Sequence, residues 1–83
     1  MTFVTFGSLA EGDYFIARQG CFYVKEMLTP PPDLPEKASN AFGFVDGIGI
    51  TARFDELTLV ERYDPAVHSR PTAIVLLEER RQA

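Results

Sequence analysis

The stretch from Gly12 to Leu28 constrains the fold of this chain more than any other part of the sequence. It contains two runs of aromatic and β-branched residues, Asp13–Arg18 and Cys21–Met27, separated by a short break that ends in Gly20. Such residues fit a pleated, half-buried surface, and a short glycine-containing break between two such runs is typical of a hairpin turn. The sequence therefore predicts an antiparallel hairpin around which the rest of the domain is built.

The same stretch predicts which hairpin side chains are buried, because side chains alternate between the two faces of a strand. Neither face is uniformly polar, and an isolated hairpin is marginally stable in water, so at least one face must be covered. We expect three apolar residues in the core: Phe15, Phe22 and Val24. We expect three residues with polar ends to stay at least partly exposed: Tyr14, Tyr23 and Lys25.

Residues 1–68 are expected to form one small β domain. Asp46-Gly47 is the strongest hairpin signal in the chain, and it joins the extended runs 38–45 and 48–54. A fifth strand is expected at 57–63, and residues 2–6 form either a short strand or an extended arm. The pattern predicts a mainly β (or α+β) fold, a small, strongly bent antiparallel sheet or SH3-like barrel of about five strands.

A proline-rich segment, residues 29–37, separates the second and third strands of this scheme. Four of its residues are proline, and Pro32–Pro35 spells a PxxP motif. Prolines remove backbone donors and fix φ, so this segment is excluded from an inner strand. We interpret it as a stiff exposed loop rather than as a ligand of a PxxP-binding domain, because such ligands usually carry a flanking basic anchor.

The C-terminal extension, residues 69–83, differs in character. Ser69 can cap a helix and Pro71 suits a first helical turn. However, Ala73–Leu77 is a continuous apolar run of strand length, for which periodicity does not separate helix from strand. We expect a helix packed on the barrel or on a partner, with a sixth strand as the alternative. Three residues are candidates for an oligomer or partner contact: Ile74, Leu76 and Leu77.

Charge and composition limit the functions that fit this chain. The 83 residues include 12 acidic and 8 basic side chains, which gives a net charge of −4. Because nucleic-acid binders neutralise phosphates with Lys and Arg, this balance argues against a nucleic acid or an anionic membrane as the partner. We see no signal peptide and no stretch near the roughly 20 apolar residues of a membrane helix, so we expect a cytoplasmic protein.

The residues that most often carry chemistry are isolated in the sequence. His68 is the only histidine, and of the metal-ligand residue types only Asp64 lies at a suitable spacing, so a surface histidine fits better than a metal site. Cys21, the one cysteine, fits a small packing residue better than a reactive thiol. The sequence has no nucleophile elbow, HExxH motif or CxxC pair. We therefore expect no catalytic residues, metal ligands, cofactor or enzymatic activity.

The candidate binding face combines aromatic residues with one lysine. Its members are Tyr14, Tyr23, Lys25, Phe42 and Phe44. If part of this set is exposed on one face, it offers a small patch for stacking or for peptide binding. In the alternative interpretation, the rings fill both sides of a thin barrel.

A resemblance to known sequences concerns the same region. The pattern Ser8-Leu9-x-x-Gly12-Asp13-x-Phe15, then Gly20-x-x-Tyr23-Val24-Lys25, then Asn40-Ala41 and a late strand ending in Val60, resembles short uncharacterised bacterial and phage proteins. The resemblance covers about residues 3–62 and implies a five-stranded SH3-like barrel. The sequence predicts a small protein-interaction or accessory domain that engages another protein or itself. The alternative is binding of single-stranded nucleic acid through exposed aromatic rings.

Overall fold

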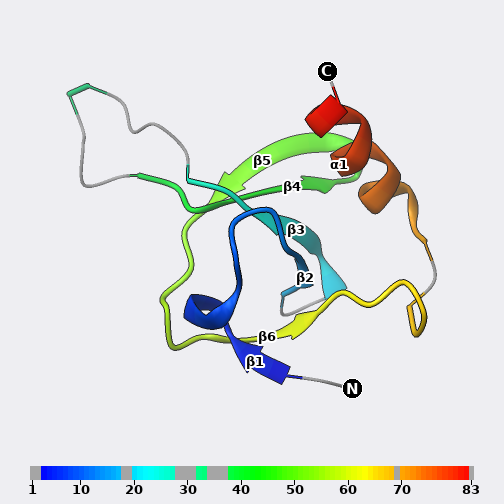
Figure 1. The fold of residues 1–83 in the computed structure, drawn as a ribbon. Helices are drawn as coiled ribbons and strands as arrows, with labels where there is room; N and C mark the ends of the chain where they lie inside the picture. The colour runs from blue at the N-terminus through cyan, green and yellow to red at the C-terminus, as the bar shows by residue number, and fades with distance from the viewer. Residues whose placement is uncertain (1–2, 18–19, 28–31, 34–37, 69, 83) are drawn as a thin grey trace.

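The computed structural model describes residues 3–17, 20–27, 32–33, 38–68 and 70–82. Within these residues, six antiparallel strands form one open, curved sheet, and a helix ends the described chain (Figure 1). The strands are β1 (Phe3–Thr5), β2 (Tyr14–Ile16), β3 (Phe22–Lys25), β4 (Ala41–Val45), β5 (Ile48–Ala52) and β6 (Leu59–Arg62). A 3-10 turn, η1, spans Phe6–Ser8, and the helix α1 spans Thr72–Gln82. The strand order across the sheet is β1-β6-β2-β3-β4-β5.

The predicted hairpin between Asp13 and Met27 is present. β2 and β3 pair antiparallel, with Tyr14 opposite Val24 and Phe15 opposite Tyr23. Gly20 has a φ of 78°, a left-handed conformation that a residue without Cβ adopts readily. The other two turn residues, 18 and 19, lie outside the described residues.

The second predicted hairpin, at Asp46-Gly47, is also confirmed. Asp46 and Gly47 both have positive φ, 52° and 78°, which defines the type I′ geometry that suits the twist of paired strands. Val45 lies opposite Ile48 across this turn, and the pairing of β4 with β5 continues to Ala41 and Ala52. A local sequence signal was sufficient here because the turn itself sets the register.

The sheet has six strands where about five were expected. The additional strand is β1, the N-terminal segment interpreted as a strand or an arm, because it finds a partner in β6: Phe3 lies opposite Glu61 and Thr5 opposite Leu59. The C-terminal extension forms the expected helix, so the sixth strand comes from the other end of the chain. The cap predicted at Ser69 and most of the proline-rich segment 29–37 lie outside the described residues.

Two apolar layers hold the fold together, one on each face of the sheet. The inner layer, enclosed by the curvature of the sheet, contains Phe6, Leu9, Phe15, Tyr23, Ala41 and Val60. The outer layer lies between the sheet and α1 and contains Val24, Ile74 and Leu77, with the partly buried rings of Tyr14, Phe22, Phe42, Phe44 and Tyr63 around them. The helix packs over β3 and β4 (Figure 1). Each fully buried large side chain contributes about 1.5–3 kcal/mol of transfer free energy.

The expected grouping of hairpin residues was wrong in one respect. Phe15 was placed with Phe22 and Val24 in a single core, but it shares the inner layer with Tyr23, while Val24 and Phe22 belong to the outer layer. The register explains this, because residues directly opposite each other point to the same face.

No helix in the described part of the chain is long and apolar enough to cross a membrane.

Candidate functional site

The structure divides the predicted aromatic face between the two sides of the sheet. Tyr23 lies in the inner layer with 8% of its surface exposed, so the expectation that it stays partly wet was wrong. Its ring stacks on Phe15 at a centroid distance of 5.7 Å, and burial raises the pKa of its hydroxyl. Tyr14, Phe42 and Phe44 lie on the outer side, packed against the layer under α1. The five predicted residues therefore do not form one surface.

Lys25 has a structural role in this fold. Its ammonium group donates hydrogen bonds to the carbonyl oxygens of Phe6 at 3.1 Å and Leu9 at 2.8 Å. The same nitrogen lies 4.7 Å from the centroid of the Phe6 ring, within cation–π range. These contacts fasten the segment around η1 to β3. They leave Lys25 less available for an external ligand than the sequence indicated.

The predicted partner contact on the C-terminal extension is largely an internal contact. Ile74 and Leu77 are buried against Val24, and Leu76 is half-buried. The extension therefore packs on the sheet of its own chain, the first of the two alternatives. The helix is also held by Arg80, whose guanidinium hydrogen-bonds Glu26 at 2.7 and 2.8 Å.

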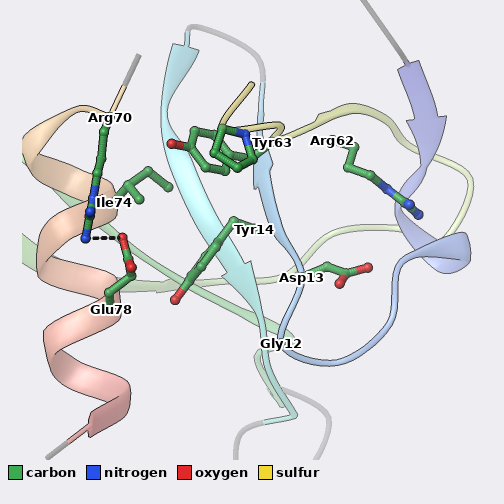
Figure 2. Close-up of a pocket in the computed structure, with 9 residues that line it drawn as sticks. Gly12, Asp13, Tyr14, Arg62, Tyr63, Arg70, Ile74 and Glu78 are labelled. Carbon is green, nitrogen blue, oxygen red and sulfur yellow. Dashed lines mark ion pairs between the residues drawn. The ribbon is translucent and has the colours of Figure 1, made fainter. Parts of the chain in front are cut away.

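A groove of about 340 Å³ opens between β2, the end of β6 and the first half of α1 (Figure 2). The rings of Tyr14 and Tyr63 meet edge to face at 6.4 Å on one side, and Ile74 contributes an apolar side chain from the helix. Arg70 and Glu78 form an ion pair of 2.9 Å on the other side. Figure 2 shows Arg62 pointing away from the helix, so the two guanidinium groups do not converge on one ligand. The groove lacks the convergent polar groups that usually orient a small molecule.

His68 lies on the outer face beside this groove, half-buried instead of fully on the surface. Its Nε2 is 2.8 Å from Glu61 Oε2, and its ring stacks on Tyr63 at 5.6 Å. The hydrogen bond to Glu61 is the main cause of a raised pKa of His68, and the backbone of Asp64 adds to it. These contacts fix the turn after β6 onto the sheet. Among the described residues, no group of three or more His, Cys, Asp or Glu side chains is arranged to hold a metal ion.

The outer face is left uncovered at its far end. Tyr63 is partly buried and Glu61 is hydrogen-bonded to His68. Leu59 and Leu57, earlier in the chain, have 63% and 81% of their surface exposed. Phe3 on β1 is 60% exposed and joins them around a shallow hollow of about 590 Å³. We call Phe3, Leu57 and Leu59 the outer apolar patch.

Sequence reasoning missed this patch. The alternation in the run 57–63 placed Leu57 and Leu59 on the same face as Glu61 and Tyr63, but it contained no sign of which part of that face is covered. The only signal was that a charged residue, Glu61, shares the face with the two leucines.

No protein-family model, no curated protein and no solved structure matches this chain. The fold and the surface define a class only at the level of architecture: a small, mainly β domain with an apolar layer on each face of its sheet. The resemblance to short bacterial and phage proteins and the SH3-like description remain predictions.

Proposed function

We propose that this chain is a non-catalytic protein-interaction domain and that the outer apolar patch is its contact surface. The observation that supports this most is the exposure of three large apolar side chains side by side, at the end of a sheet face that α1 covers elsewhere. Single exposed apolar residues are ordinary on protein surfaces, whereas a contiguous group indicates a binding surface. Burying it against a partner would remove this apolar area from water at about 25 cal/mol per Å².

The charges around the patch favour one kind of protein partner. Asp55 and Glu56 directly precede Leu57, and both are exposed. The chain as a whole carries a net charge of −4. Complementary charge speeds encounter and selects among partners. The partner we propose is therefore a protein segment that combines apolar side chains with Lys or Arg.

The roles of the chemically capable side chains support a non-catalytic function. Lys25 donates to backbone carbonyls, His68 is held by Glu61, and Arg80 pairs with Glu26. These contacts stabilise the fold, and they do not gather around a common cleft. The nucleic-acid alternative has less support, because all ten Phe and Tyr residues lie within the described chain and only Phe3 among them is exposed.

A random peptide library displayed on phage tests the proposal. Selection on the immobilised full chain is expected to enrich peptides that combine apolar and basic residues. The variant Leu57→Ser/Leu59→Ser is expected to lose most of the binding of a selected synthetic peptide, measured by fluorescence anisotropy. The matched control is Met27→Ser, which removes another apolar side chain, 67% exposed, outside the patch. A library without enrichment, or peptides that bind the double variant as well as the wild type, would contradict the proposal.

A further inference from the structure

We propose that β5 pairs with β5 of a second copy of this chain, so that two six-stranded sheets join across a two-fold axis. This inference concerns the edge of the sheet and does not depend on the outer apolar patch. β5 is the last strand in the sheet order, and no strand among the described residues pairs with its outer side (Figure 1). A strand in this position exposes a row of backbone donors and acceptors.

β5 lacks the features by which natural proteins protect a sheet edge. Such edges are usually very short, or they carry a lysine, a proline or a bulge. β5 has five residues, Ile-Gly-Ile-Thr-Ala, with no charge and no proline. The opposite edge, β1, has three residues, and the carbonyl of Thr5 already accepts the Ser8 hydroxyl at 2.7 Å. Of the two edges, β5 is therefore the better template for pairing.

The turn geometry shows which backbone groups are open. A two-residue turn is flanked by a hydrogen-bonded pair, here Val45 and Ile48, and such pairs alternate along an antiparallel ladder. The backbone groups of Gly49 and Thr51 therefore point to the open edge. Antiparallel pairing with Ile50 at the two-fold axis sets Gly49 opposite Thr51 of the second copy. Both hydrogen-bonded pairs around the axis then form from groups that are otherwise left to water.

The side chains around β5 favour an identical, antiparallel partner. Asp46 lies just before the strand and Arg53 just after it, and both are exposed. In the register described, Arg53 lies opposite Gly47 of the second copy, next to its Asp46, so opposite charges meet at both ends. Parallel pairing in register would set each charge beside its own kind. Ile48, 67% exposed, comes to lie opposite Ala52 of the second copy.

Sedimentation equilibrium on the full chain tests the proposal, from roughly 10 µM to 1 mM, because small interfaces are weak. The average mass of the wild type is expected to rise with concentration toward twice that of the monomer. Thr51→Lys, which sets two ammonium groups near the axis, is expected to raise the dissociation constant at least about tenfold. Thr72→Lys is the matched control, because Thr72 is exposed on α1 and the substitution changes the net charge equally.

A second variant distinguishes loss of strand pairing from misfolding of Thr51→Lys. Arg53→Glu brings like charges together at both ends and is expected to weaken the dimer, and adding Asp46→Asn is expected to restore part of the association. In the wild type, hydrogen exchange of the Gly49 and Thr51 amides is expected to slow as concentration rises. A chain that stays monomeric at about 1 mM overturns the proposal. A dimer that resists both edge variants but dissociates in Leu59→Ser also overturns it, because the interface would then be the outer apolar patch.

Discussion

Arg80 and Glu26, 54 positions apart, form a two-pronged ion pair in which Nη1 lies 2.7 Å from Oε2 and Nη2 lies 2.8 Å from Oε1. The guanidinium carbon of Arg80 also lies 3.8 Å from the centroid of the Phe42 ring. The hydrogen bonds to Glu26 are the main cause of a raised pKa of Arg80. This arrangement fastens the last turns of α1 to β3 and β4.

We predict that Arg80→Ala lowers the free energy of unfolding by about 1 kcal/mol, because it removes a two-pronged ion pair and a cation–π contact together. Urea denaturation followed by circular dichroism measures the change. Arg70→Ala is the control, since the Arg70 guanidinium lies 2.9 Å from Glu78 and its side chain is far more exposed than that of Arg80. Its expected cost is below about 0.5 kcal/mol. Equal costs for the two variants would show that the Arg80 contact does not hold the helix.

Leu77→Ala is predicted to be more damaging. The Leu77 side chain is 0% exposed in the outer layer, and truncation of a buried leucine costs about 2–5 kcal/mol. The half-buried neighbour Leu76 is the control, and Leu76→Ala is expected to cost less than half as much. Thermal and urea unfolding of both variants give the comparison. A larger loss for Leu76→Ala would mean that the helix presents a different face to the sheet.

Gly43→Ala is predicted to destabilise the fold by about 1–3 kcal/mol through overpacking. A Cβ at this position would lie 2.5 Å from Tyr23 Cδ1 and 2.6 Å from the Phe22 carbonyl oxygen, which is too close for any ordinary contact. Gly47→Asn is the control, because a Cβ at Gly47 meets nothing within 4 Å and asparagine tolerates its positive φ. Unfolding by urea measures both. A neutral Gly43→Ala would show that Tyr23 can shift without loss.

His68 is predicted to make stability depend on pH near neutrality. Its pKa in the folded protein is raised above 6.5, mainly by the hydrogen bond to Glu61, so the folded state favours the protonated ring. The resulting stabilisation is fully present below the unfolded pKa and is lost as pH rises through the folded value. NMR titration of the ring should give a pKa above 6.5, and Glu61→Gln should lower it. The wild type and the His68→Gln variant should differ in their free energy of unfolding, and this difference should decrease as pH rises from 6.5 through the pKa of the folded protein.

A folded pKa at or below 6.5 would contradict this prediction. It would mean that burial of the ring outweighs the hydrogen bond to Glu61. A pH dependence that persists in His68→Gln would assign the effect to another group. In either case the turn from Asp64 to His68 would be held by its backbone hydrogen bonds, which include His68 N–H to the Asp64 carbonyl at 2.8 Å.

The elements of this fold followed from local sequence because their causes are local. The type I′ turn at Asp46-Gly47 depends on two residues that accept positive φ, and alternation within a few positions defines the strands around it. The helix after Pro71 likewise follows from residues of its own segment, although its apolar run left a strand open. The mainly β class and the C-terminal helix could therefore be predicted without coordinates.

The assignment of residues to faces depended on distant parts of the chain. Period-two alternation sorts a strand into two sets of side chains, but it does not say which set will be covered, or by what. Tyr23 is buried and Leu59 is exposed because the curvature of the sheet encloses one and α1 stops short of the other. Ile74 packs inside its own molecule for the same reason: the sheet face it covers is assembled from segments some fifty residues earlier, such as Val24.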